Sequence, residues 1–120
     1  MLKHILKTEA IYQGETVASK GERLLEAVGS IEGKRMLSTI LYVGMHEGCT
    51  KGQLYDVVSR NIRMPDMLRE LESRGILKID IGPDGHSEKL SLTSLGKKVF
   101  VLVKQCAELL IILSVQSGQT

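Results

Sequence analysis

The amino-acid sequence predicts a mainly α-helical domain with one small antiparallel β-hairpin. Three observations lead to this fold class. Within residues 36–45 and 64–71, apolar residues recur at spacings of three and four, which is typical of helices that bury one face. Apolar and polar residues alternate on both sides of a turn near residue 83, which is typical of a hairpin. Residues 95–113 then carry a long apolar repeat at helical spacing.

The composition is that of one soluble globular domain. The chain has 120 residues, enough to bury one hydrophobic core with little left for a second. Its net charge of +2 is too small to indicate a nucleic-acid binder by itself, so the distribution of charge must decide. With only three Tyr, one Phe and no Trp, the chain does not suit modules that stack single-stranded bases on aromatic rings.

The sequence also predicts where the protein resides. The first residues are interrupted by Lys3, His4 and Lys7 and lack the apolar stretch of a signal peptide, so we expect a cytoplasmic protein. Cys49 and Cys106 lie far apart and form no repeated spacing, so we expect free thiols rather than a disulfide framework.

We divide the chain into three parts. Residues 1–30 form an N-terminal extension that we predict to be helical, residues 31–93 the central domain, and residues 94–117 a C-terminal helix. In the extension, we expect one helix face from Leu2, Ile5 and Leu6 and another from Leu24, Leu25 and Val28, separated by a loop with the sequence QGETVASKG.

The central domain begins with two predicted helices. The first buries one face, formed by Met36, Leu37, Ile40, Leu41 and Met45, and Gly48 can end it in a left-handed conformation. Before the second, Thr50 and Gln53 have the spacing of a capping box, in which each side chain accepts a hydrogen bond from a backbone N–H group. The expected buried side of this short helix is Leu54, Val57 and Val58.

A third helix, over about residues 62–74, and a hairpin complete the domain. The helix buries Met64, Leu68 and Leu71, and it must hold Pro65 in its first turn and end at Gly75. In the hairpin, apolar residues alternate with polar ones in each strand, and Gly82-Pro83-Asp84-Gly85 has the pattern of a type I turn. The apolar face of the hairpin is predicted to contain Ile79, Ile81, Leu90 and Leu92.

This order of helices and strands resembles a winged helix-turn-helix domain. The resemblance rests on TKGQLYDVVSRNIRMPDMLRELESRGILKI, on the wing GPDGHSE and on LSLTSLGKK, and it covers roughly residues 32–98. Two steps within these stretches carry most of it, Leu71-Glu72-x-x-Gly75-Ile76 and Leu92-Thr93-x-x-Gly96. The sequence is most similar to the multiple-antibiotic-resistance and phenolic-acid-decarboxylase families of transcriptional regulators.

The resemblance implies a dimeric regulator that binds double-stranded DNA sequence-specifically, with the third helix in the major groove. At the start of that helix, Asn61 and Arg63 are our candidates for base contacts, because both side chains can bind base edges bidentately. Asp66 and Glu70 add negative charge to the same face, and the wing lacks an arginine, so we expect modest affinity. The candidate DNA-binding residues are Lys51, Arg60, Asn61, Arg63, Asp66, Arg69, His86 and Lys89.

The C-terminal helix carries two apolar seams, which predicts two partners. One seam needs to pack on the central domain and the other to meet a second copy across a two-fold axis. The candidate dimer seam is Leu95, Val99, Leu102, Cys106, Leu109 and Leu113, and the second seam is Phe100, Val103, Ala107 and Leu110. Lys104 and Glu108 interrupt the helix, so we do not expect a membrane span.

The sequence offers no basis for catalysis or for a cofactor. No motif brings a serine, a histidine and a carboxylate together, and no glycine-rich phosphate loop follows a strand. His46 and Cys49 form one short pair, whereas a structural zinc site normally needs two, so we expect no metal. Two alternatives to DNA binding stay open: a winged-helix module for protein–protein interaction, and a ligand sensor whose small-molecule effector the sequence does not name.

Overall fold

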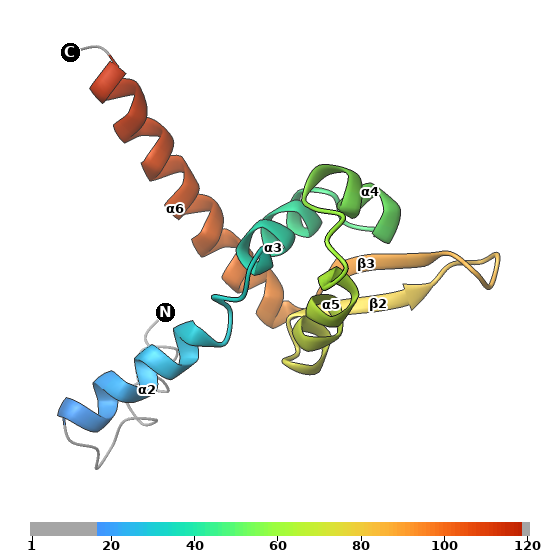
Figure 1. Ribbon diagram of the computed structural model, residues 1–120, viewed down its shortest axis with the longest axis horizontal. Helices are drawn as coiled ribbons and strands as arrows, with labels where there is room; N and C mark the ends of the chain where they lie inside the picture. The colour runs from blue at the N-terminus through green and yellow to red at the C-terminus, as the bar shows by residue number, and fades with distance from the viewer. Residues whose placement is uncertain (1–16, 119–120) are drawn as a thin grey trace. The chain divides into compact units, whose positions relative to one another are not determined.

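The computed structural model describes residues 17–118 (Figure 1). They divide into two compact units, one ending at Glu32 and one beginning at Gly33. The first unit contains α2 (Val17–Gly29), and the second contains all other elements. These are α3 (Met36–Met45), β1 (Cys49–Thr50), α4 (Lys51–Val57), α5 (Met64–Ser73), β2 (Leu77–Ile81), β3 (Glu88–Leu92) and α6 (Ser94–Gly118).

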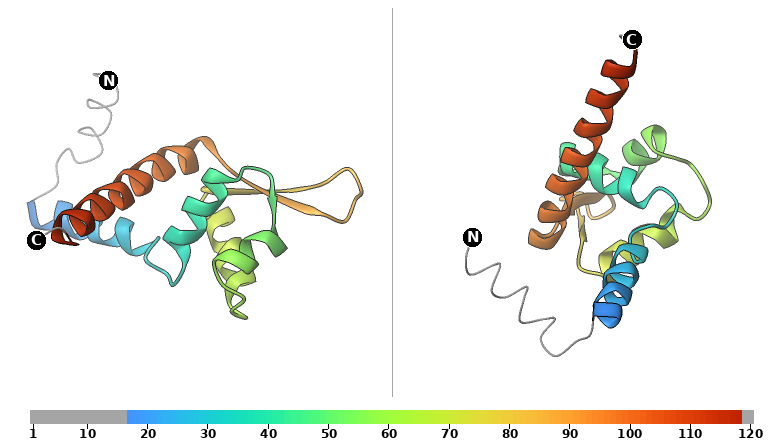
Figure 2. Two further views of the ribbon diagram at one scale, coloured as in Figure 1. Left: turned by 90° about the horizontal axis from the view of Figure 1, so that it is seen from above. Right: turned by 90° about the vertical axis from the view of Figure 1, so that its left-hand side faces the viewer.

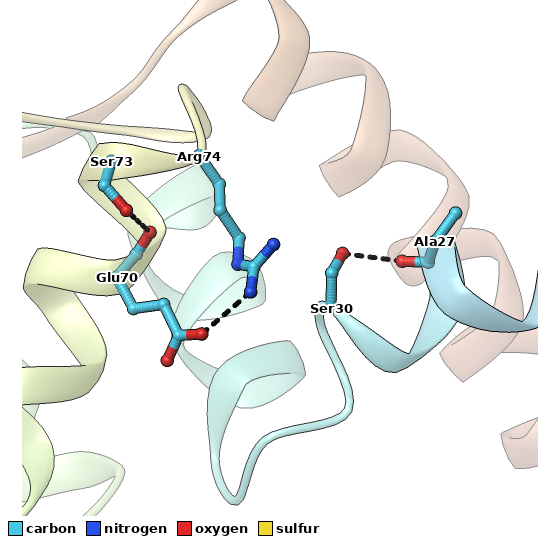
Figure 3. Close-up of polar contacts among 5 residues, drawn as sticks. All are labelled: Ala27, Ser30, Glu70, Ser73 and Arg74. Atoms are coloured by element: carbon cyan, nitrogen blue, oxygen red, sulfur yellow. Dashed lines mark hydrogen bonds and ion pairs between the residues drawn. The ribbon is translucent and has the colours of Figure 1, made fainter.

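Helix α2 confirms part of the prediction for the N-terminal extension. It contains Leu24, Leu25 and Val28, all exposed, and it closes with a hydrogen bond that the Ser30 hydroxyl donates to the carbonyl of Ala27, 2.6 Å away (Figure 3). The predicted loop QGETVASKG was wrong over residues 17–21, because this segment forms the first turn of α2. The predicted face of Leu2, Ile5 and Leu6 lies outside the described residues.

Helix α3 supplies the centre of the core of the second unit. Its buried face consists of Met36, Thr39, Ile40 and Val43, and the Thr39 hydroxyl is satisfied by donating to the carbonyl of Arg35. The prediction that Leu37 and Met45 are buried was wrong, since they are 43% and 56% exposed. Apolar residues occupy more than one side of this helix, so periodicity alone could not select the buried side.

The sheet has three strands in the order β1-β3-β2, all antiparallel, where the sequence predicted only the hairpin of β2 and β3. The additional strand is two residues long, and it pairs Cys49 with Leu90. Gly48 has the predicted left-handed φ, +85°, but α3 ends at Met45, so Gly48 turns the chain into β1 instead of capping the helix.

The hairpin has the predicted alternation and turn. Leu77 and Leu92 face each other and are buried, whereas Ile81, at the far end of the same face, is 69% exposed. Its predicted burial was wrong because the hairpin projects beyond the helices here (Figures 1 and 2). In the predicted turn, the N–H of Gly85 donates to the carbonyl of Gly82, 2.9 Å away.

Helix α5 is the element that the sequence predicted best. It starts at Met64, has Pro65 in its first turn, and buries Met64, Leu68 and Leu71 as expected, together with Met67. Gly75, with φ of +75°, ends it, because the N–H of Ile76 then donates to the carbonyl of Leu71. Before it, α4 begins with the predicted capping box of Thr50 and Gln53. In α4 only Leu54 is fully buried, and the predicted burial of Val57 was wrong because it is 66% exposed.

One junction joins α5, β2, β3 and α6. The carbonyl of Ile76 accepts a hydrogen bond of 3.1 Å from the N–H of Thr93, just after β3. The Thr93 hydroxyl donates to the carbonyl of Gly75 and accepts from the N–H of Gly96, so it also caps the first turn of α6. A Cβ on Gly96 would collide with the carbonyl oxygen of Ile76. The two motifs that carry the family resemblance therefore meet here in space.

Beyond this junction, α6 packs against α3 near its start and then extends past it (Figures 1 and 2). The ring of Phe100 occupies the space that a Cβ on Gly44 would need, so the two helices approach closely. None of the helices in the described part of the chain combines the length and apolar content of a membrane span.

We predict that Gly96→Ala destabilises the fold by about 1–3 kcal/mol, because the added methyl group meets a backbone oxygen that cannot turn away. Gly52→Ala is the matched control. Gly52 lies in α4, where a Cβ comes no closer than 3.9 Å to another group, so this change should leave stability equal or up to about 1 kcal/mol higher. Chemical denaturation measures both, and equal stabilities of the two variants would contradict the role of the junction.

Candidate nucleic-acid interface

The turn between α4 and α5 is built around Asn61. Its side-chain oxygen accepts a hydrogen bond of 2.9 Å from the N–H of Arg63, and its backbone carbonyl accepts one of 3.0 Å from the N–H of Met64. Its own N–H donates to the Ser59 hydroxyl. Asn61 therefore fixes the start of α5, a role that the sequence analysis did not assign to it. Its side-chain amide NH2 group remains as a donor.

Arg63 is the N-cap residue of α5, and its side chain is exposed. Among the residues that the structure describes, its guanidinium has neither an ion-pair partner nor a hydrogen-bond acceptor. Because α5 buries Met64, Met67, Leu68 and Leu71, Arg63 stands at the exposed end of a helix whose opposite face is fixed in the core. This guanidinium is available to a partner.

Two of the three acidic residues of α5, Asp66 and Glu70, are paired with nearby arginines, whereas exposed Glu72 has no ion-pair partner among the described residues. Asp66 pairs with Arg69 at 2.6 Å, and Glu70 pairs with Arg74 at 2.9 Å. Figure 3 shows the second pair, beside the Ser73 hydroxyl that donates to the carbonyl of Glu70. The Asp66 pair is largely exposed, so it adds little to stability and can exchange partners. Neither of these two paired carboxylates leaves an uncompensated charge on the exposed face of α5.

Two further predicted cations are also paired. Lys51, at the start of α4, lies 2.7 Å from Glu88 of β3, and Arg60 forms an ion pair with Asp56 one turn earlier in the chain. Lys89 is exposed and lies opposite Thr50 in the sheet, so it is close to Lys51 in the fold. The sequence could not show the pair of Lys51 and Glu88, because the two residues meet only through the strand β1 that it failed to predict, whereas Asp56 and Arg60 are four residues apart.

The wing carries a persistent negative charge. Hydrogen bonds from the Ser87 hydroxyl and from the backbone N–H groups of Ser87 and His86 lower the pKa of the Asp84 carboxyl to about 2. His86 is exposed beside it, far along the chain from the start of α5. The eight predicted residues thus form three groups: Asn61, Arg63, Asp66 and Arg69 along the start of α5, with Arg60 just before it; Lys51 and Lys89 at the sheet; and His86 at the wing.

Ile62 is a feature of this surface that the sequence analysis did not single out. It lies between Asn61 and Arg63 and is 90% exposed, the highest exposure among the large apolar side chains of the described residues. The available signal was its position, since it is an apolar residue within a polar loop and outside the repeat of α5. The side chain gains nothing from the core and is free to meet another molecule.

The short pair of His46 and Cys49 lies where the chain passes from α3 to β1. Cys49 is buried, and this burial raises the pKa of its thiol. His46 is the C-cap residue of α3, and its ring lies 4.6 Å from that of Tyr42. Among the described residues, no three His, Cys, Asp or Glu side chains are grouped to hold a metal ion.

Comparison with solved structures decides the fold. A proposed transcriptional regulator of the MarR family from Enterococcus faecalis V583 matches 90% of this chain and 100% of its own, with a TM-score of 0.69 and 16% identity. The adhesin competence repressor from Streptococcus pyogenes matches 88% of this chain and 83% of its own, with a TM-score of 0.66 and 13% identity. This chain has the MarR-type winged helix-turn-helix fold.

A third similar structure includes a ligand. FabT from Streptococcus pneumoniae, solved in complex with DNA, matches 97% of this chain and 82% of its own, with a TM-score of 0.61 and 15% identity. No protein-family model and no curated protein matches the sequence. In the winged helix-turn-helix fold, α4 and α5 are the helix-turn-helix, α5 is its second helix, and the hairpin of β2 and β3 is the wing.

Proposed function

We propose that the protein regulates transcription by binding double-stranded DNA sequence-specifically as a dimer, with α5 of each subunit in the major groove. The observation that carries this proposal is the start of α5, where the Arg63 guanidinium, without an ion-pair partner among the described residues, lies at the exposed end of a rigidly packed helix. The structural similarity to FabT, a protein solved in complex with DNA, supports the same use of the fold.

Within this proposal, sequence is read by the N-terminal end of α5. Arg63 donates bidentately to the O6 and N7 atoms of a guanine, and the amide NH2 of Asn61 donates to a neighbouring base edge. Ile62 supplies an apolar contact, for which the methyl group of thymine is the matching partner in the major groove. Arg60, Lys51 and Arg69 contact phosphates, which position the protein without reading sequence.

The ion pairs set the strength of binding. Arg60, Arg69 and Lys51 each exchange a carboxylate for a phosphate when DNA arrives, so their net gain is smaller than that of an unpaired cation. With the acidic wing turn at Asp84, this favours modest affinity and leaves most of the specificity to α5.

The dimer is proposed to form through α6. In the candidate dimer seam, Leu95, Leu102, Leu109 and Leu113 are 52%, 66%, 62% and 58% exposed, and Cys106 is exposed as well. The second seam is half-buried at Phe100, Val103 and Ala107, the part that runs alongside α3. Full burial of one leucine contributes about 1.5–3 kcal/mol, so covering the exposed seam with a second copy would stabilise a dimer substantially. Half-sites would then lie about 34–36 Å apart.

A protein–protein interaction module is the second candidate function. A shallow groove of about 300 Å³ between α3 and α4 supports it, because Met45 and Val57 on its walls are exposed apolar residues. The pairing of Asp66 and Glu70 with Arg69 and Arg74 also suits a protein partner, because it leaves little net charge at these positions. A dimer that retains no affinity for any duplex at low salt would favour this candidate.

We predict that Arg63→Ala weakens binding to a duplex selected from a randomised pool by about 5- to 150-fold, the loss of one bidentate base contact. It should also relax the sequence preference at one position. Arg60→Ala should weaken selected and random duplexes alike and lower the salt slope by about 1, because it removes a phosphate contact. Fluorescence anisotropy measures both. If both variants bind like the parent, the reading end is wrongly assigned.

We predict that Ile62 detects a thymine methyl group. Replacing that thymidine by deoxyuridine removes one buried methyl group and should weaken binding of the parent about fourfold. Ile62→Ala should bind the two duplexes equally. Ile81→Ala, which changes an exposed apolar residue on the wing, should preserve the discrimination. The contact is disproved if replacing each thymidine of the duplex in turn by deoxyuridine never changes the affinity of the parent.

We predict that Leu102→Glu with Leu109→Glu converts the dimer to a monomer and lowers affinity for a two-half-site duplex more than tenfold, because the two half-sites are no longer bound together. Gln105→Glu is the control, since it adds a charge to an exposed position of α6 outside the seam. Sedimentation equilibrium measures the mass. A parent protein that sediments as a monomer would contradict the proposed interface.

A further inference from the structure

A hollow of about 740 Å³ lies beside the start of α5, and we call it the basic hollow. Three buried methionines, Met36, Met64 and Met67, line its base and join α3 to α5. Its polar lining comes from three separate segments: the chain before α3, the turn before α5, and the first two turns of α5. Because Asn61 and Arg63 belong to this lining, the basic hollow is continuous with the candidate reading end.

The unpaired charge in the basic hollow is positive. Lys34, Arg35 and Arg63 all line it, and in the described part of the chain none of the three side chains has an ion-pair partner. Asp66 and Glu70 also line it, but both are already paired with arginines of α5. Lys34 and Arg35 lie about thirty residues from Arg63 in sequence, so only the fold brings these cations together.

The backbone at Arg35 gives an independent indication. It is the N-cap residue of α3 and has φ of +71°, the only positive value at a non-glycine position among the described residues. This conformation favours glycine or asparagine, and its cost of about 1 kcal/mol or more is seldom accepted without a function. The Arg35 side chain makes no capping hydrogen bond to α3, so the start of this helix does not explain an arginine here.

The geometry points to an oxyanion-binding site in the basic hollow, and we infer that its ligand is a phosphate group of the DNA backbone beside the base pairs that α5 reads. This inference rests on the proposed function. Three cations around one concave site suit a group with several anionic oxygens. Lys34 and Arg35 thereby extend the DNA contact beyond the helix-turn-helix to α3.

The position of the basic hollow beside Arg63 favours a DNA phosphate over a free phosphate as the ligand. Arg63 cannot enter the major groove without bringing the neighbouring sugar-phosphate backbone towards the segment before α3, because both line the same hollow. A phosphate there is held by contacts that carry no sequence information, and its binding releases counterions. A free phosphate shares this chemistry, and the experiment separates the two sources.

The test compares two double variants with equal loss of charge. Lys34→Gln with Arg35→Asn removes two cations of the basic hollow, and asparagine is chosen because it tolerates the left-handed backbone of residue 35. Lys97→Gln with Lys98→Gln removes two exposed cations of α6, which do not line the hollow. Thermal unfolding establishes that both variants are folded. Binding of the selected duplex and of a random duplex is then measured from 50 to 200 mM salt.

We expect the variant of the basic hollow to lose affinity for both duplexes in the same proportion, with its sequence preference intact. Two lost phosphate contacts reduce the steepness of log K against log salt by about 1.8. Over this fourfold range of salt, the affinity of the parent should therefore fall about twelvefold more than that of the variant. The variant at Lys97 and Lys98 should keep the slope of the parent.

Three outcomes would overturn the inference. If the variant of the basic hollow keeps the parental slope while Arg63→Ala loses affinity, the DNA phosphate does not lie there and the proposed function stands. If the parent binds no duplex, the proposed function is wrong, and so is the assignment of the ligand to a DNA phosphate. In the last experiment, inorganic phosphate is titrated at constant ionic strength, and the amide chemical shifts of residues 33–38 are followed. Saturable shifts that the variant of the basic hollow loses, while that variant keeps the parental DNA salt slope, would assign the site to a free anion instead.

Discussion

The carbonyl group of Ile76 holds the most consequential position in this fold. It accepts the N–H of Thr93, and it lies against Gly96 where no Cβ could fit. Through this group, the end of α5, the start of the wing and the first turn of α6 are held as one rigid body. The orientation of the exposed start of α5 relative to α6 therefore depends on these backbone contacts together with the buried face of α5. This explains why two short glycine-containing motifs suffice to indicate the fold at low overall identity.

Electrostatics divides the exposed residues into two classes. Lys51, Arg60, Arg69 and Arg74 each have a carboxylate partner, whereas Arg63, Lys34 and Arg35 have none among the described residues. A duplex would therefore first meet a surface with little net charge and one cluster of unpaired cations. Such a surface does not bind anions indiscriminately, because each paired cation must first give up its carboxylate. Its selectivity then depends on the shape and chemistry of the few groups at the start of α5. The modest net charge of +2 is consistent with this arrangement.

The parts of the fold that the sequence predicted are those determined by local chemistry. The capping box of Thr50, the buried face of α5 and its end at Gly75 each depend on residues within a few positions of one another. The strand β1 was missed because two residues are too few to show a period, and with it the pairing of Lys51 with Glu88. Likewise, the convergence of Lys34 with Arg63 exists only in three dimensions. The hydrogen bond from the N–H of Arg63 to the Asn61 side chain is local, and its Asx pattern was a signal that the sequence analysis did not use. Of the candidate site, the sequence analysis named Asn61, Arg63 and their charged neighbours but not Ile62, nor Lys34 and Arg35, which only the fold brings to the start of α5.

The close approach of α3 and α6 has a mechanical consequence. The Phe100 ring sits where a side chain of Gly44 would be, so α6 is anchored near its base, while residues 108–113 are exposed. At a rise of about 1.5 Å per residue, the helix continues roughly 27 Å beyond that anchor. A rigid rod held at one end is a lever: a tilt of about 10° at the anchor displaces its tip by nearly 5 Å. In the proposed dimer, small repacking at Gly44 would therefore change the separation of the two α5 helices by more than the rise between adjacent base pairs.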